Sequence, residues 1–133
     1  MKQKKSHKKE TFLLYLKAYL PSILWGGLIF IMSNQEQLPG FSISLLDFLL
    51  KKLAHMFVYA VFYYFLFHAY LNTHQTQQAT KKHYLIPLFI ALIYAISDEV
   101  HQSFVAGRYA STRDIAYDFL GMMSILLYQQ KML

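Results

Sequence analysis

Four of the seven acidic residues of this chain lie in one stretch, YAISDEVHQSFVAGRYASTRDIAYDFLG (residues 94–121). The same stretch holds one histidine and two arginines, and strongly apolar sequence flanks it on both sides. Carboxylate, imidazole and guanidinium groups can transfer protons, bind phosphate or hold a metal ion. This stretch is therefore the first place to look for chemistry.

A second group of polar residues has helical spacing. Lys52, His55 and Tyr59 are three and four positions apart, which places them on one face of a helix. Each has a plain structural interpretation: a lysine at a helix end often anchors at the membrane boundary, and His55 and Tyr59 can form a packing pair. The coincidence with other polar faces is more informative than any single member.

Two more polar faces are expected within residues 94–121. Asp114 and Asp118 are four apart, and Gly121 follows at the next helical step. If the preceding helix continues into the acidic stretch, Asp98 and Gln102 also share a face. A carboxylate inside a membrane span costs at least ~2.5 kcal/mol when it faces lipid, so these groups should point inward and pair.

Composition indicates that lipid is the solvent of this chain. Its 133 residues are 56% hydrophobic and only 15% charged, and they include 11 Phe and 11 Tyr. Aromatic residues with a polar tip are favoured at bilayer boundaries. Cysteine is absent, which excludes disulfides, thiolate catalysis and Cys-ligated metals.

The formal charge of +6 does not indicate a nucleic-acid-binding protein. Five lysines lie in the first nine residues, so the excess is a basic segment at one end and not a charged face. A basic segment beside an apolar helix is typical of contact with anionic lipid or of the cytoplasmic side of a membrane protein. We expect membrane lipids as partners, and no nucleic acid.

Apolar runs predict four membrane-spanning helices, each near the ~20 residues that a bilayer core requires. Ser111 or Thr112 can cap the last one, and Asp114 suits its positive end. The predicted spans are Tyr19–Met32 (with Phe12 as an alternative start and Pro21 as an entry turn or kink), Lys52–Leu71, a third from Tyr84 through Ile96 with Pro87 in its first turn, and a fourth from residues 111–114 to Tyr128.

Lysine placement predicts the orientation. The basic segment and the lysines at 81–82 mark cytoplasmic ends, which puts both termini inside and segments 33–51 and 98–113 outside. The predicted fold is thus an all-α integral membrane protein with four transmembrane helices in a small bundle. Residues 1–11 form a basic cytoplasmic tail and residues 12–133 the transmembrane domain, located in the cell membrane.

With this topology the polar faces of three helices meet at the outer leaflet. The residues also resemble the VanZ-like family of small bacterial membrane proteins. The resemblance rests on a first helix ending in IFIMSNQ, on KxxHxxxY at Lys52, and on a closing block of the form D-E-x-x-Q-x-F-x-x-G-R…D-x-x-x-[DN]-x-x-G. Two positions depart from the family pattern: Ala106 stands where proline is usual, and Ile125 where a second glycine is common.

The resemblance implies a four-helix membrane protein, and the founding member is associated with reduced susceptibility to teicoplanin-type lipoglycopeptides. We expect a site that binds or modifies a lipid-linked cell-envelope precursor or an anionic lipid headgroup, in which Lys52 and Arg108 hold phosphate. Whether the chain is an enzyme stays open, and no cofactor is indicated. The candidate catalytic residues are His55, Asp98, Glu99, Asp114 and Asp118, and the candidate binding residues are Lys52, Tyr59, Gln102, Arg108, Ser33 and Gln35.

Three alternatives remain at this level. A divalent cation could bind two or three of Asp98, Glu99, His101 and Asp114, although no strong metal-binding spacing is present. The polar cluster could instead be a structural ion-pair network in a protein that binds a partner or an envelope precursor. Transport is disfavoured because the acids gather at one end of the spans.

Overall fold

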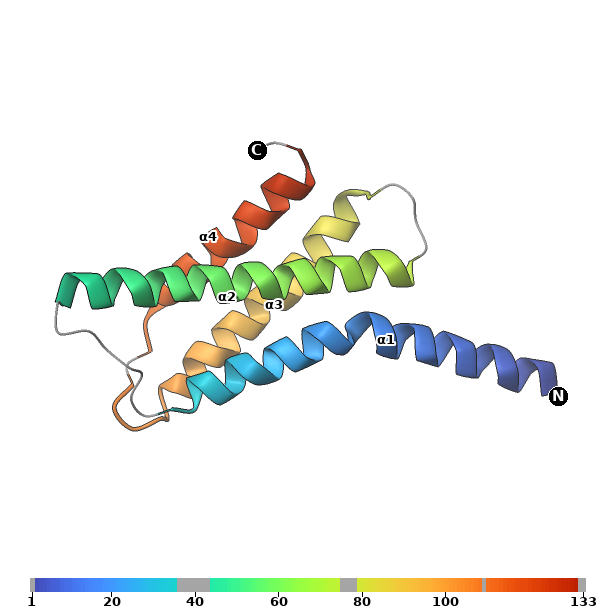
Figure 1. Cartoon of the computed structure of the whole chain (residues 1–133), viewed down its shortest axis with the longest axis horizontal. Coiled ribbons are helices and arrows are strands. Elements are labelled where there is room, and N and C mark those ends of the chain that lie inside the picture. The colour runs from blue at the N-terminus through green and yellow to red at the C-terminus, as the bar shows by residue number, and fades with distance from the viewer. Residues whose placement is uncertain (1, 36–43, 75–78, 109, 132–133) are drawn as a thin grey trace.

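Four helices make up the described part of the chain. The computed structural model describes residues 2–35, 44–74, 79–108 and 110–131, with side chains from Glu10 onward. The helices are α1 (Lys2–Ser33), α2 (Ser44–Thr73), α3 (Lys81–Gln102) and α4 (Thr112–Gln129), and these residues contain no strand (Figure 1). The all-α class is confirmed. Part of the predicted outer segment 33–51, residues 36–43, lies outside the described residues.

Three helices begin earlier than the apolar runs predict. α1 begins at Lys2, and α2 begins at Ser44 and not at Lys52. Asp47 lies in the first turn of α2, where a carboxylate suits the positive end of the helix. α3 begins at Lys81 and not at Tyr84, since Thr80 precedes it as the N-cap residue and its backbone N–H donates to His83 Nδ1 at 3.1 Å.

The acidic stretch is helical at its start. α3 continues through Asp98 to Gln102, which answers whether residues 98–102 form a helix or a loop. Because α3 starts early, Pro87 lies in the second turn of the helix and not in the first. In the second turn, proline removes one N–H group that would otherwise form a hydrogen bond within the helix. α4 begins as predicted: Ser111 is the N-cap residue, and its hydroxyl accepts from the Arg113 N–H at 3.3 Å.

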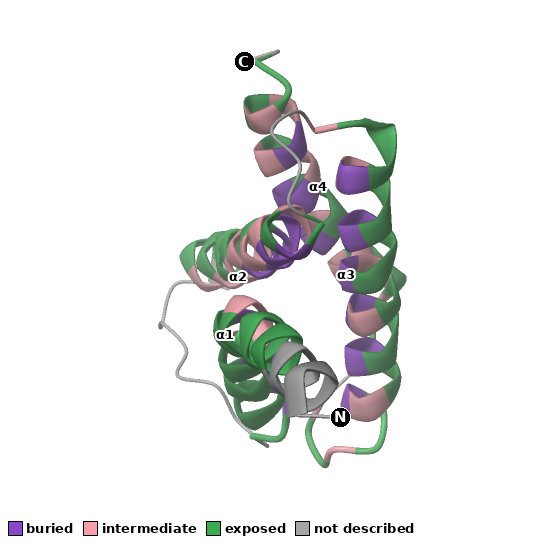
Figure 2. Ribbon diagram, turned by 90° about the vertical axis from the view of Figure 1, so that its right-hand side faces the viewer, coloured by how far each residue is buried: buried purple, intermediate pink, exposed green. Residues whose placement is uncertain are grey.

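The core lies between α2, α3 and α4, with one side of α1 against it. Figure 2 shows the buried faces of α2, α3 and α4 turned toward each other, while most of α1 is exposed. Ala91 and Ala95 of α3 are fully buried, and their small side chains allow close packing. At Trp25 and Gly26, two side-chain hydrogen bonds tie α1 to its neighbours: Trp25 Nε1 donates to Val58 O at 2.9 Å, and the Tyr94 hydroxyl donates to Gly26 O at 2.7 Å.

Two of the described helices are long and apolar enough to cross a membrane, Glu10–Ser33 within α1 and Lys81–Gln102. In the most apolar stretch of each helix, only 17% and 33% of the residues are buried within the chain, whereas the core helix of a soluble protein is mostly buried. Large apolar side chains such as Leu24 and Ile93 are about two-thirds exposed, at 65% and 66%. An exposed apolar surface of this kind is typical of a membrane protein, in which lipid covers the apolar side chains.

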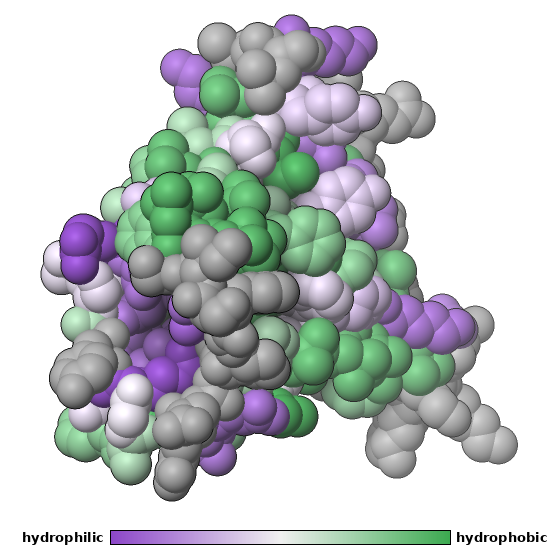
Figure 3. All heavy atoms as spheres, turned by 60° about the vertical axis from the view of Figure 1, so that its left-hand side comes forward, coloured by the Kyte–Doolittle hydropathy of each residue, from purple (hydrophilic) through white to green (hydrophobic). Residues whose placement is uncertain are grey.

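The polar residues gather at one end of the molecule. α1 and α3 end there, α2 and α4 begin there, and this end lies to the left in Figure 1. Seen from that side in Figure 3, hydrophilic residues fill a hollow with hydrophobic surface around it. The fold therefore positions one polar recess among apolar helices.

Candidate functional site

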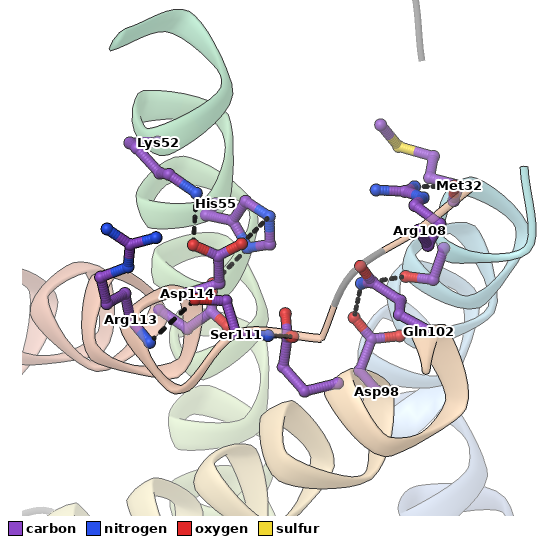
Figure 4. A network of polar contacts seen from close by, with 12 residues as sticks. Met32, Lys52, His55, Asp98, Gln102, Arg108, Ser111, Arg113 and Asp114 are labelled. Atoms are coloured by element: carbon purple, nitrogen blue, oxygen red, sulfur yellow. Dashed lines mark hydrogen bonds and ion pairs between the residues drawn. The ribbon is translucent and has the colours of Figure 1, made fainter. Parts of the chain in front are cut away.

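Facing side chains of α2 and α4 form the centre of the recess. Lys52 Nζ forms an ion pair with Asp114 Oδ1, and His55 Nδ1 lies 2.9 Å from Asp118 Oδ1. The other ring nitrogen, His55 Nε2, lies 3.9 Å from Asp114 Oδ2. The two polar residues of α2 thus face the two acidic residues of α4, and each pair of residues is spaced by one helical turn. Figure 4 shows Lys52, His55 and Asp114 of this group.

A glycine makes this pairing possible. A Cβ atom added at Gly121 would lie 2.7 Å from the Met56 carbonyl carbon and closer still to its oxygen. The backbones of α2 and α4 therefore touch one turn beyond Asp118, and only glycine fits. This close approach of the two helices accompanies the contact between the short Asp118 side chain and His55.

α3 contributes two buried carboxylates that face different neighbours. Asp98 Oδ2 accepts from Gln102 Nε2 at 3.0 Å, and the same amide nitrogen lies 3.3 Å from Ser33 Oγ at the end of α1. Glu99 Oε2 accepts from the Ser111 backbone N–H at 2.8 Å, which connects α3 to the start of α4. These hydrogen bonds join the end of α1, the end of α3 and Ser111, the residue before α4.

Arg108 closes the recess on the side of α1. Gly107 has φ of 76°, a conformation that favours glycine, and turns the chain so that Arg108 reaches back to α1. Its guanidinium donates from Nε to Gln35 O at 3.1 Å and from one terminal nitrogen to Met32 O at 2.9 Å. Gln35 therefore contributes its backbone carbonyl. These bonds use two of the five guanidinium N–H groups.

A cavity of about 150 Å³ lies between these groups. Its polar lining comes from every described element around the recess, and Ile29, Ala54 and Val58 form an apolar wall. The polar and charged residues that line it are Ser33, Lys51, Lys52, His55, Tyr59, Asp98, Gln102, Arg108 and Asp114. An amphipathic ligand could place a polar group among these side chains and an apolar part along the wall.

The predicted site residues differ in whether they line the cavity. Glu99 and Asp118 are buried beside the cavity, exposed by 4% and 1%, and they do not line it. Tyr59 is 2% exposed, and its hydroxyl makes no hydrogen bond to the described residues. His101, proposed as a metal ligand, stacks instead on Phe30 with ring centroids 4.7 Å apart. The structure therefore does not bring His101 together with Glu99, because residues two positions apart lie about 160° from each other around a helix axis.

Carboxyl groups outnumber basic side chains in this cluster. Lys52 pairs with Asp114 and His55 with Asp118, whereas Asp98 and Glu99 have no basic side chain within ion-pair distance among the described residues. Arg108 likewise contacts main-chain carbonyls and no carboxylate in that part of the chain. The recess therefore contains two buried acidic side chains without a basic partner among the described residues. It also contains a guanidinium, that of Arg108, which can donate hydrogen bonds to an anionic ligand.

The chain matches the family model VanZ/LLP1 over residues 4–129. The chain belongs to the VanZ/LLP1 family. The match covers all four helices nearly from end to end, and so includes every residue of the recess. Neither the curated proteins nor the solved structures contain a match to this chain.

Sequence reasoning missed several members of the site in this VanZ/LLP1 protein. The carbonyl of Met32 and the N–H of Ser111 are backbone groups, and no residue type announces their role. The apolar wall looks like ordinary membrane-facing sequence. Of the two departures from the family pattern, Ala106 is exposed, and Ile125 packs against the core where a glycine is common.

Proposed function

We propose that this protein crosses the cell membrane with all four helices, keeps both termini in the cytoplasm, and binds the phosphate-bearing head of a lipid-linked envelope component at its outer face. The observation that carries the proposal is the cavity that joins Lys52 and Arg108 to an apolar wall. Arg108 supports it most strongly, because its remaining N–H groups can bind phosphate oxygens in a fork.

The orientation follows from charge. Lysines of the first nine residues and of 81–82 lie at the helix ends opposite the recess, and such lysines favour the cytoplasmic side. α2 is 30 residues long, which is enough to cross, and its lysines fall in its first half beside the recess. The 18 residues of α4 reach across most of a bilayer core, with Asp114 and Asp118 satisfied by α2.

The absence of cysteine makes this topology directly measurable. We expect Ala106→Cys to react with a membrane-impermeant maleimide in intact cells, and Lys82→Cys to react only after the membrane is opened. Both positions are exposed, and no native cysteine competes for the reagent. The opposite labelling pattern would contradict an outward-facing recess.

Lipid retention tests the function. Purified full-length chain is incubated with a polyprenyl pyrophosphate, and bound lipid is counted by native mass spectrometry. We expect Arg108→Gln to bind at least about tenfold more weakly, since a charge-assisted hydrogen bond contributes about 1.5–3 kcal/mol. Arg113→Gln is the matched control, because Arg113 is exposed near the start of α4 and does not line the cavity.

Two results would reject the proposed ligand. One is equal retention by Arg108→Gln and Arg113→Gln, and the other is equal retention of the uncharged polyprenol by the native chain. Binding of the pyrophosphate lipid would also offer a route to altered lipoglycopeptide susceptibility, because removing or modifying an envelope precursor changes what the antibiotic meets.

A further inference from the structure

His55, Glu99 and Asp118 form a group at the wall of the cavity, where His55 lines it and the two buried carboxylates do not. The proposed binding of phosphate at Arg108 does not use this group. One donor atom from each residue lies within 4.8 Å of the other two, and each residue comes from a different helix. From these residues we infer a binding site for one divalent transition-metal ion, such as Zn²⁺ or Mn²⁺, that joins α2, α3 and α4. The inference does not depend on the lipid proposal.

The donor types fit such an ion. One imidazole nitrogen and two carboxylates are ligands that Zn²⁺ and Mn²⁺ accept, whereas Mg²⁺ and Ca²⁺ prefer oxygen alone. Metal–ligand bonds of about 2.0–2.2 Å place neighbouring donors roughly 3–3.5 Å apart. His55 Nδ1 and Asp118 Oδ1 are already 2.9 Å apart, so mainly Glu99 has to move by a side-chain rotation.

An unpartnered atom gives independent support. Glu99 is only 4% exposed, and its Oε1 has no hydrogen-bond partner among the described residues. A buried carboxylate oxygen without a partner is costly. A metal ion at the centre of the three donors would satisfy it and would supply the positive charge that Glu99 otherwise lacks.

Surrounding groups hold the donors as known metal sites do. Histidine ligands usually direct their second nitrogen toward a carboxylate, and here His55 Nε2 lies 3.9 Å from Asp114 Oδ2, which Lys52 holds in place. The second oxygen of Glu99 is fixed by the Ser111 N–H at 2.8 Å. Both partners restrict the orientation of the ligand side chains that they contact.

The test uses the full chain, purified in detergent without a polyhistidine tag and stripped with chelator. Zn²⁺ or Mn²⁺ is then titrated, and bound metal and melting temperature are measured. We expect one ion per chain at this site and a melting temperature about 5–10 °C higher at a hundredfold excess over Kd, since the ion joins three helices. Glu99→Gln should lose at least about tenfold in affinity and lose the stabilisation.

Asp98→Asn is the matched control, since Asp98 is an equally buried acid of the same helix that is not among the three donors. His74→Gln removes a second source of binding, because His74 and His83 lie near each other at the opposite end with ring centroids 5.9 Å apart. If Glu99→Gln does not fold, Asp118→Asn replaces it. The inference fails if native chain shows no stabilisation, or if Asp98→Asn loses as much affinity as the donor variant.

Discussion

Replacing Gly121 by alanine is expected to lower the melting temperature of the purified protein by about 10 °C, or to prevent its folding. The added methyl group would overlap the Met56 carbonyl, which is backbone and cannot turn away. α2 and α4 would have to separate, at a cost of about 3 kcal/mol or more. Circular dichroism in detergent measures the loss.

Gly27→Ala provides the matched control for that variant. A Cβ atom at Gly27 of α1 meets nothing within 4 Å. Alanine at this position should therefore leave the melting temperature unchanged or raise it slightly. Similar melting temperatures for the two variants would show that α2 and α4 do not touch at Gly121. The pairing of His55 with Asp118 would then lose its structural basis.

Removing the charge of Lys52 is the second change with a large expected effect. Lys52→Met removes the lysine partner of Asp114, whose side chain is only 13% exposed. His55 Nε2, at 3.9 Å, is then the nearest basic group to this carboxylate among the described residues. We expect a loss of about 3 kcal/mol, because a charge left unpaired in a partly buried site is costly. Fluorescence of Trp25, the single tryptophan, follows unfolding at the contact of α1 with α2.

The neighbouring lysine provides the comparison. Lys51 pairs with Asp47 along the helix surface, and its side chain is 41% exposed, so Lys51→Met should cost no more than about 0.5 kcal/mol. The double variant Lys52→Met with Asp114→Leu should recover part of the loss, since an apolar pair replaces a buried ion pair at little cost. Equal stability of Lys51→Met and Lys52→Met would contradict the paired geometry.

These stability measurements also address the structural alternative. Most polar side chains of the recess do pair with one another, so a purely structural network would explain Lys52, Asp114 and Asp118 well. It explains only two of the five guanidinium N–H groups of Arg108, those that donate to main-chain carbonyls at the end of α1. A variant of Arg108 that folds as the native chain but no longer binds lipid separates the two readings.

Helical spacing predicted which residues of one helix share a face, and this is why Lys52 with His55 and Asp114 with Asp118 were grouped correctly. The partner of each across the helix contact was not predictable, because a single sequence carries no information on how two helices are rotated about their axes. Gly121 was noted only for its spacing. Its role depends on the Met56 carbonyl, which is a property of the packed pair.

Helix starts were predicted less well, for a different reason. Apolar runs mark where a helix enters lipid, and a helix can begin outside it. A signal for the start of α2 was present in Asp47 of its first turn, and the cap of α3 in Thr80 and His83. Both lie before the apolar run, so a search for membrane spans passes over them.

The central claim is that phosphate of a lipid head binds at Arg108, and one distance tests it most directly. The chain has only two arginines, so the Arg113→Gln protein grown with ¹⁵N-labelled arginine carries a signal from Arg108 alone. Reconstituted with a polyprenyl pyrophosphate, it should show ³¹P–¹⁵N dipolar dephasing in solid-state NMR that corresponds to about 4 Å, the separation of a hydrogen-bonded guanidinium and phosphate. Bound lipid without dephasing of the Arg108 signal would contradict the claim.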